Sequence, residues 1–170
     1  LDPAHGLAHL SLSEVQLFLG RPAEDRLATV AKAVLLLPDN PRAHLRYAEV
    51  SQELGDLNNA ALHARCAADR KPDYFEAQML LARVEQEQGN LPTAIRAAEA
   101  ATQLDPKSST AWVLKAEIES QQNKLALAAA SMKKAADLVG RSAPLYRKAA
   151  DLAEAAQDEQ TAAALRARAD

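Results

Sequence analysis

Two histidines in the stretch "HGLAH", residues 5–9, have the spacing closest to that of a metal site. His5 and His9 are four residues apart, which can place two imidazoles on one face of a helix, as zinc sites require. Gly6 is expected at the start of the helix, which would leave His5 outside the regular turn. We therefore interpret His5 as a connector residue and His9 as a packing residue, and we expect no bound metal.

The other histidines and the single cysteine give weaker signals. His44 and His63 have no ligand-like neighbours in the sequence and are expected to be interfacial or surface groups. Cys66 is the only cysteine, which excludes an internal disulfide. It is expected to be free and partly exposed, and a redox or catalytic role would require a nearby activating cation or base.

Acidic side chains cluster in "EQEQ" at 85–88 and in "AEAAQDEQ" at 153–160. A pair of carboxylates can act as general acid and base, but on helices such runs are most simply solvated faces. No GxGxxG, GxxxxGK[ST], GxSxG or HExxH motif occurs. The sequence therefore predicts a non-enzymatic protein without a cofactor, although distant residues can converge in space.

Charge and hydropathy exclude two classes of partner. Twenty Lys and Arg against 23 Asp and Glu give a net charge of −3, with the two signs mixed along the chain. Binding nucleic acid needs a concentrated basic face, so nucleic acid is not expected as a partner. No run approaches the roughly 18 apolar residues of a membrane span, so direct membrane insertion is not expected either. The compartment stays open, since bacterial cytoplasm and periplasm both suit this composition.

The elements that would hold these residues are predicted to be helices. The chain is 48% apolar, but only 4% of its residues are aromatic and only five are glycine. Alanine is abundant, and it is the strongest helix former. Too few β-branched and aromatic residues remain to build a sheet, so an all-α fold is expected.

Small and turn-forming residues recur every 34 positions. The stretches "LGDLNNAALHARCAADRKPD" and "QGNLPTAIRAAEAATQLDPK" place their glycine, two alanines and proline in the same register. The longest columns are Ala60, Ala94, Ala128 and Ala162; Ala33, Ala67, Ala101, Ala135 and Ala169; Ala48, Ala82, Ala116 and Ala150; and Pro38, Pro72 and Pro106. Ser13 joins the third column if Gly20 is an insertion. A fixed period of this length indicates a stacked repeat protein, with units at about 6–40, 41–74, 75–108, 109–142 and 143–170.

Each unit is predicted to form two antiparallel helices. The first helix is expected to end near Gly20, Gly55, Gly89, Asn123 or Gln157, and the second near Pro38, Pro72, Pro106 or Gly140. All eight prolines and all five glycines are then expected at helix boundaries or connections. Alanine columns mark the points where helices cross, because a methyl side chain lets the two axes approach closely.

This pattern resembles the tetratricopeptide repeat family over almost the whole chain. The resemblance implies an α-solenoid, a right-handed superhelix of about five 34-residue helix-turn-helix repeats, in which the first helices line a concave groove. The family favours an aromatic residue early in the first helix. Trp112 and Tyr146 supply it, whereas His9, His44 and Gln78 do not. Lys115 occupies a column that is usually apolar.

The two ends of the array are expected to be open. Leu1 to Pro3 repeat the "LDP" that ends the third unit, so they are expected to be the tail of an earlier repeat of a longer array. The last residues, "TAAALRARAD", finish a second helix with no polar capping helix after it. Self-association through the repeat ends is one consequence.

Helical phase indicates which residues line the groove. The predicted groove residues are Leu10, Arg42, Leu45, Arg46, Glu49, Met79, Arg83, Glu87, Val113, Glu117, Arg147, Lys148 and Asp151, with Glu14, Gln52 and Gln86 beside them. Four of them, Leu10, Leu45, Met79 and Val113, form an apolar stripe that would suit a peptide or an amphipathic helix of a partner protein. The alternative is that these four side chains pack against neighbouring helices.

Two functional hypotheses follow. The first is a non-enzymatic scaffold that holds another protein for assembly of a complex. The second is a targeting or recruiting arm of a larger enzyme or of a bacterial secretion machine. The resemblance also implies that the Lys and Asn clamp with which some family members bind a carboxyl terminus is absent here, since Glu49, Arg83 and Glu117 occupy that surface.

Overall fold

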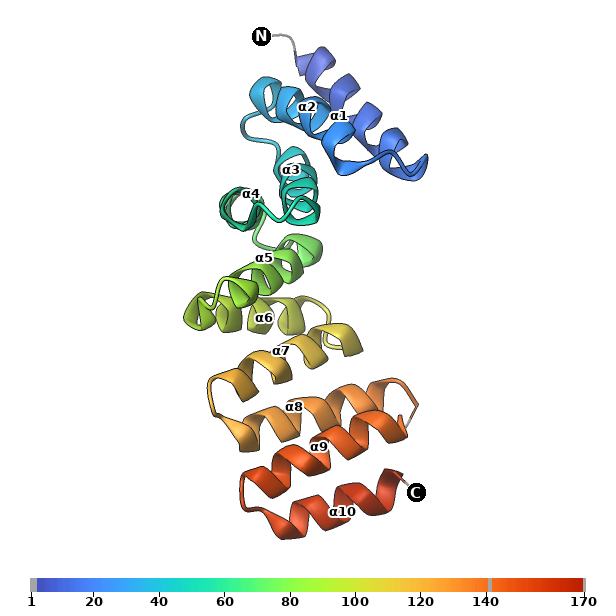
Figure 1. Ribbon diagram of the computed structural model, residues 1–170, viewed down its shortest axis with the longest axis vertical. Coiled ribbons are helices and arrows are strands. Elements are labelled where there is room, and N and C mark those ends of the chain that lie inside the picture. Colours follow the sequence, from blue (N-terminus) through green and yellow to red (C-terminus); the bar gives the residue numbers. More distant parts are fainter. Residues whose placement is uncertain (1–2, 141, 170) are drawn as a thin grey trace. The chain divides into compact units, whose positions relative to one another are not determined.

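The computed structural model describes residues 3–140 and 142–169, and within them every regular element is an α-helix (Figure 1). The all-α prediction is confirmed. The helices are α1 (Pro3–Phe18), α2 (Ala23–Leu36), α3 (Pro41–Glu53), α4 (Leu57–Arg70), α5 (Phe75–Glu87), α6 (Leu91–Leu104), α7 (Ser109–Gln121), α8 (Leu125–Leu138), α9 (Ala143–Ala155) and α10 (Glu159–Ala169). Over these ranges, no helix is both long and apolar enough to span a bilayer.

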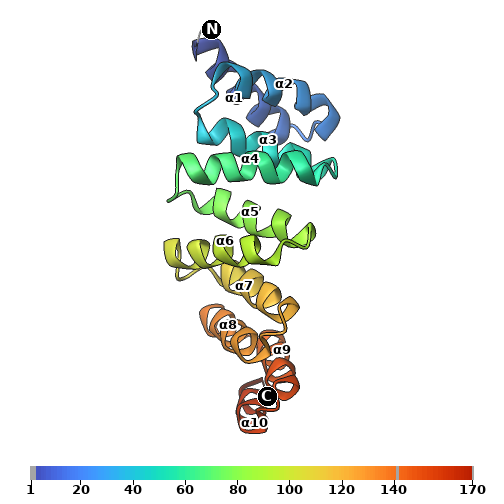
Figure 2. The same ribbon diagram turned by 90° about the vertical axis from the view of Figure 1, so that its left-hand side faces the viewer.

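The chain divides into two compact units, residues 1–88 and 89–170. In the first unit α1 packs on α2, α3 on α4, and each second helix packs on the first helix that follows it, α2 on α3 and α4 on α5 (Figure 2). In the second unit α6 packs on α7, and α7 to α10 contact one another in sequence order (Figure 1). Within each unit, helices that are neighbours in sequence therefore form antiparallel pairs, as the repeat predicts.

The turns between first and second helices use left-handed backbone. Gly55 and Gly89 follow α3 and α5 with φ of 75° and 76°. Asn123 and Gln157 take the same place after α7 and α9 with φ of 59° and 63°. Glycine tolerates this conformation best, and asparagine is the usual substitute. The predicted ends of the first helices are confirmed, including the two ends that lack glycine.

Gly6 does not lie at a helix boundary, and that expectation is wrong. It lies within α1 and is buried against α2. A Cβ atom built on Gly6 would come within 2.6 Å of Leu37 Cγ and 2.9 Å of Leu36 Cβ. Real Cβ atoms do not approach other heavy atoms so closely. Gly6 is therefore required because α1 and α2 approach each other closely here, and not because of turn geometry.

The alanine columns form the core, as predicted. Ala48, Ala82, Ala116 and Ala150 are fully buried, and Ser13, which precedes them in the column, is 3% exposed. The two second-helix columns, Ala60 to Ala162 and Ala33 to Ala169, are buried at every position. Methyl side chains at these crossing points let the helix axes approach to about 8 Å, the short end of the usual range.

A side chain early in three first helices forms a hydrogen bond to the carbonyl oxygen of the preceding proline. The indole N–H of Trp112 donates to the carbonyl oxygen of Pro106 at 3.0 Å, and the amide of Gln78 donates to that of Pro72 at 3.3 Å. Nε2 of His44 lies 2.8 Å from the carbonyl oxygen of Pro38. His44, Gln78 and Trp112 are 34 residues apart, as are the three prolines. Each of these hydrogen bonds therefore connects the first turns of a first helix to the proline that follows the preceding second helix.

Two glutamates are buried, which corrects the expectation that "EQEQ" is a solvated face. Glu85 in α5 is 1% exposed and pairs with Arg65 of α4. Glu119, which is 34 residues later in α7, is 4% exposed; Ser131 Oγ of α8 donates to its Oε2 at 2.7 Å, and Lys115 Nζ lies 3.8 Å from its Oε1. A buried carboxylate needs such partners to offset its loss of hydration. Both carboxylates hold helices together and belong to no reactive pair.

Candidate functional site

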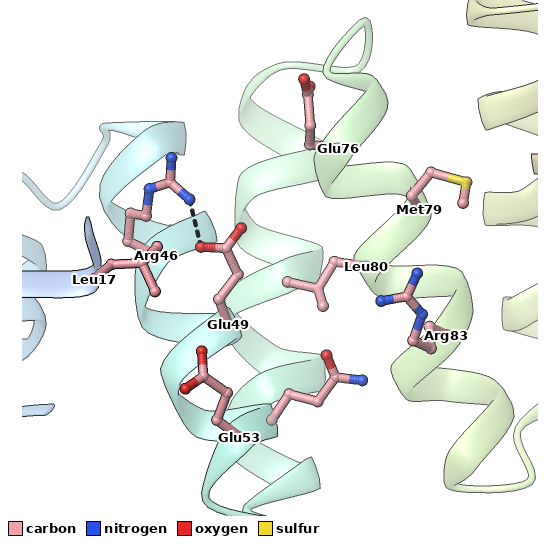
Figure 3. A pocket seen from close by; sticks show the side chains of 9 residues that line it. Leu17, Arg46, Glu49, Glu53, Glu76, Met79, Leu80 and Arg83 are labelled. Atoms are coloured by element: carbon pink, nitrogen blue, oxygen red, sulfur yellow. Dashed lines mark hydrogen bonds and ion pairs between the residues drawn. The ribbon is translucent and has the colours of Figure 1, made fainter. Parts of the chain in front are cut away.

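A pocket of about 310 Å³ opens between three first helices of the first unit (Figure 3). It is lined by Leu17 of α1; by Arg46, Glu49, Gln52 and Glu53 of α3; and by Glu76, Met79, Leu80 and Arg83 of α5. Figure 3 shows Leu80 and Arg83 extending from α5 toward α3. First helices supply the whole lining, as expected for the binding surface of this architecture.

The apolar part of the pocket is small and unequally exposed. Met79 and Leu80 are 9% and 6% exposed, whereas Leu17 is 42% exposed at the α1 side. Figure 3 shows Leu80 extending toward α3 and Met79 on the opposite side of α5. An occupant would therefore bury mainly the side chain of Leu17.

A chain of charges runs along the α1 and α3 side of the pocket. Glu14 Oε1 lies 2.6 Å from Arg42 Nη2 and 3.5 Å from Arg46 Nε, and Arg46 Nη1 donates to Glu49 Oε2 at 2.6 Å. Burial disfavours the charged form of Arg46, but the hydrogen bond and the charge of Glu49, together with Glu14, outweigh burial and raise its pKa. Arg46 is therefore held in place and is not free to bind an incoming group.

Two other lining groups are also engaged within the protein. Glu53 pairs with Arg26, which is buried in α2, and Gln52 Nε2 donates to Glu87 Oε1 at 2.9 Å between α3 and α5. By contrast, Glu76 and Arg83 are exposed, and within residues 3–140 and 142–169 neither forms an ion pair. These two opposite charges on α5 are the ones available to a ligand.

The structure brings four predicted groove residues together in this pocket: Arg46, Glu49, Met79 and Arg83, with Gln52 beside them. Arg42 and Glu87 are exposed next to it. Sequence reasoning missed four further lining residues, namely Leu17, Glu53, Glu76 and Leu80. The 34-residue period could have predicted two of these, because Glu76 and Leu80 lie 34 residues after Arg42 and Arg46, which were predicted to line the groove.

Two members of the predicted apolar stripe are not available to a ligand. Leu10 is 4% exposed and packs with Ala33 and Ala43, and Leu45 is 2% exposed. For these two residues the alternative holds: they pack against neighbouring helices. The helical periodicity of the sequence predicts on which face of a helix a leucine lies. Whether that face is buried depends on the neighbouring helices.

The remaining predicted residues belong to the second unit. Val113 is half-buried, and Glu117, Arg147 and Lys148 are exposed. Asp151 is also exposed and lies 3.9 Å from Arg166 Nη2 of α10. Arg147, Asp151, Arg166 and Ala169 line a depression of about 340 Å³. Three of these four side chains are charged.

His44 of α3 and His63 of α4 lie against each other, so of the two expected placements, interfacial or surface, the interfacial one is confirmed. Their Nδ1 atoms lie 2.8 Å apart, and the ring of Tyr47 lies 4.1 Å from that of His63. Since the two nitrogens share a hydrogen bond, they do not face a common metal position. His5 and His9 both lie in α1, so His5 is not outside the regular turn. In the described ranges no three His, Cys, Asp or Glu side chains form a metal-binding group.

Cys66 and Lys115 have ordinary structural surroundings. Cys66 is a free, partly exposed thiol in α4, as predicted. Lys115 is 18% exposed, and its ammonium lies 5.3 Å from the centre of the Trp112 ring in addition to its contact with Glu119. The aromatic face and the carboxylate explain how a lysine is accommodated in a column that is usually apolar.

Comparisons with known proteins give a family match for part of the chain and a fold for nearly all of it. Residues 79–144 match the sequence model of the tetratricopeptide repeat. Comparison with curated protein sequences finds no significant match. A solved structure of MamA from Desulfovibrio magneticus RS-1 superposes with a TM-score of 0.82 at 19% identity, covering 96% of this chain and 92% of that one.

Two further solved structures have the same fold. YrrB, described as a TPR protein with an unusual peptide-binding site, has a TM-score of 0.82 at 14% identity and covers 95% of this chain and 82% of its own. PilF from Pseudomonas aeruginosa has a TM-score of 0.75 at 21% identity, covering 97% of this chain and 76% of its own.

The helices outside residues 79–144 have the same two-helix architecture and the same buried alanine columns as those inside it. The left-handed turns after the first helices also recur on both sides of that segment. Residues 79–144 therefore match the tetratricopeptide repeat in sequence, and the helices on either side of them share its fold.

Proposed function

We propose that this protein is a non-enzymatic interaction scaffold, and that the pocket between α1, α3 and α5 holds a peptide or a helix of a partner protein. The observation that carries the proposal is the pairing pattern of the charges. Most ionic groups around the pocket are engaged within the protein, whereas Glu76 and Arg83 are exposed and unpaired among the described residues. A binding surface needs such groups to orient its ligand.

The lining indicates the kind of ligand that suits the pocket. An apolar side chain of the ligand would lie against Leu17 and Leu80, where it is shielded from water. A basic group beside Glu76 and an acidic group beside Arg83 would complement the two free charges. A short segment with one apolar anchor between residues of opposite charge meets these requirements. The fold that the chain shares with YrrB, a TPR protein with a peptide-binding site, supports this assignment.

Peptide selection tests the proposal without a named partner protein. Peptides selected from a random display library on the whole chain are titrated calorimetrically against wild type, Leu17→Asp and Arg83→Glu. We expect Leu17→Asp to weaken binding by about tenfold or more, because it places a charge at the apolar anchor. Arg83→Glu should change the association rate and its salt dependence.

A matched control separates binding from folding. Leu35 in α2 is 66% exposed and lies outside the pocket, so Leu35→Asp should leave peptide affinity unchanged. Thermal melting is measured on the same variants, and all should melt within a few degrees of wild type because the altered side chains are exposed. If Leu17→Asp binds every selected peptide as tightly as wild type does, the peptides do not bind in this pocket.

A further inference from the structure

Tyr74 occupies the N-cap position of α5, where α3 and α7 carry small polar residues. Asn40 caps α3 with hydrogen bonds from two backbone N–H groups at 3.0 and 3.1 Å, and Ser108 caps α7 with one at 3.3 Å. Both residues are 34 positions from Tyr74, whose side chain makes no capping hydrogen bond. Asparagine and serine are preferred N-cap residues, and tyrosine is not. The first turn of α5 therefore lacks a side-chain cap that the repeat provides in α3 and α7.

Backbone geometry does not require the tyrosine. The φ and ψ angles are −90° and 92° at Tyr74, −87° and 112° at Asn40, and −73° and 103° at Ser108. A serine or an asparagine at position 74 can therefore cap α5 with the geometry used in the other helices. A residue that breaks a local rule of its own repeat is expected where a functional site needs it.

The Tyr74 side chain lies beside the charges of the pocket between α1, α3 and α5. Glu76, which lines this pocket, is two residues further along the chain. Burial and the charge of Glu76 raise the pKa of Tyr74, and the charges of Arg46 and Arg42 of α3 oppose that rise. The phenol therefore keeps its hydrogen at neutral pH. It adds a neutral O–H donor at the Glu76 side of the pocket.

This hydroxyl is available to a ligand. Tyr74 is half-exposed, and over residues 3–140 and 142–169 its hydroxyl forms no hydrogen bond. Lys71 Nζ lies 4.9 Å from the centre of the ring, a cation–π contact that involves the ring and leaves the hydroxyl unused. A phenol O–H donates to an oxygen acceptor, and each residue of an extended peptide offers one in its main-chain carbonyl.

The spacing of the two unpaired charges gives an extended and a helical ligand different signatures. Figure 3 shows Glu76 near the start of α5 and Arg83 further along the same helix. They are seven residues apart, which corresponds to about 10.5 Å along the helix axis. An extended chain covers this length with about three residues, whereas a helix needs about seven. The charge spacing of a bound sequence therefore reports its conformation.

We propose that Tyr74 is a further residue of the peptide site and that it selects an extended segment, to whose main-chain carbonyl oxygen its hydroxyl donates. This inference rests on the proposed function of the pocket. The residues of the segment that meet Glu76 and Arg83 are about three positions apart, and an apolar side chain between them lies against Leu17 and Leu80. A helical segment does not satisfy Tyr74, because its main-chain carbonyl oxygens are bonded internally except in the last turn.

A defined peptide tests the role of the hydroxyl. The tightest-binding sequence from a display library of randomised peptides, selected on the whole chain, is synthesised with a fluorescent label, and its affinity is measured by anisotropy. We expect Tyr74→Phe to weaken binding by about three- to tenfold, because only the hydroxyl is lost. Tyr74→Ser should weaken binding further, since the ring is lost too. Tyr47→Phe, the same change at a residue of α3 outside the pocket, is the matched control and should bind as wild type does.

Thermal melting separates a ligand contact from a structural role. Tyr74→Ser should melt at the temperature of wild type or above it, because serine can cap α5. A lower melting temperature of Tyr74→Ser, together with unchanged affinity of Tyr74→Phe, would make Tyr74 a structural residue and overturn the proposal.

Failure of this inference is distinguishable from failure of the proposed function. If Leu17→Asp weakens binding of the labelled peptide and Tyr74→Phe does not, the pocket remains the binding site and the role of Tyr74 is wrong. If neither variant changes the affinity, both proposals are wrong. Selected sequences whose basic and acidic residues are about seven positions apart, rather than about three, would overturn the extended conformation.

Discussion

His44 and His63 face each other across α3 and α4 with their Nδ1 atoms 2.8 Å apart. The protonation of the pair follows from its neighbours. The carbonyl oxygen of Pro38 can only accept, so Nε2 of His44 carries a hydrogen and donates to it at 2.8 Å. When both rings are neutral, His44 accepts at Nδ1 and His63 donates its Nδ1–H to it. The contact requires that one of the two Nδ1 atoms carries no hydrogen.

This pair predicts a loss of stability in mild acid. Burial, and then the proximity of His44, lower the pKa of His63 from 6.5 to about 4. The unfolded chain therefore takes up a proton between these pH values that the folded chain does not, so the free energy of unfolding falls as pH falls from about 6.5 to about 4. Because His63 is half-exposed, we expect a contribution of only about 1 kcal/mol.

Urea titrations at about pH 7.5 and about pH 5 measure this contribution. His63→Gln should reduce the difference in unfolding free energy between the two conditions, whereas His9→Gln, outside the pair, should not. An identical pH dependence for wild type and His63→Gln would show that the pair does not titrate as described.

Gly6→Ala should destabilise the protein although alanine is the better helix former. The gain in helix propensity is about 0.5–1 kcal/mol. The new Cβ would lie 2.6 Å from Leu37 Cγ and 2.9 Å from Leu36 Cβ, so α1 and α2 must move apart. Overpacking of this kind costs about 1–3 kcal/mol. Chemical denaturation measures the stability of Gly6→Ala. Ser11→Ala is the control, because Ser11 is an exposed residue of α1. A Gly6→Ala protein more stable than wild type would contradict the close approach of α1 and α2.

Glu119→Ala should cost about 1–3 kcal/mol, because it leaves the buried hydroxyl of Ser131 without its acceptor and removes the partner of Lys115. Glu117→Ala in the same helix is the control, since Glu117 is exposed, and it should change stability by less than about 0.5 kcal/mol. The two denaturation midpoints are compared. Equal midpoints would mean that the buried carboxylate contributes no net stability.

Ala94→Leu should destabilise the second unit by about 1–3 kcal/mol, since Ala94 is fully buried in α6 and a larger side chain would overpack the site. Ala130→Leu, at an exposed position of α8, provides the comparison and should be near neutral. Differential scanning calorimetry measures both variants. A midpoint of Ala94→Leu equal to that of Ala130→Leu would argue against a tight contact at Ala94.

The expectations about Leu1 and Asp2 fall outside the described residues. At the opposite end, the expectation that no polar capping helix follows the second helix of the last unit is untested, since α10 is itself that second helix. Arg166 is exposed in α10, whereas the corresponding residues of the other second helices are buried: Val30, Ala64, Ala98 and Met132.

The sequence by itself determined the helices, their pairing and the identity of the core columns. A 34-residue period repeats local rules that need no distant partner: positive φ at Gly55 and Gly89, a missing N–H at proline, and a methyl group at each crossing. Asn123 and Gln157 follow the same period despite their different chemistry, because the backbone geometry of the turn recurs even where the residue changes.

Only the tertiary structure decided which faces are covered and which charges are free. Leu45 and Val15 both lie on apolar faces of first helices, but Leu45 is buried and Val15 is exposed because packing depends on the helix next to each. Glu85 and Glu76 lie on the same helix, yet one is buried against Arg65 and the other is unpaired beside the pocket. Helical periodicity fixes the direction of a side chain, whereas burial and charge pairing depend on residues that are distant in sequence.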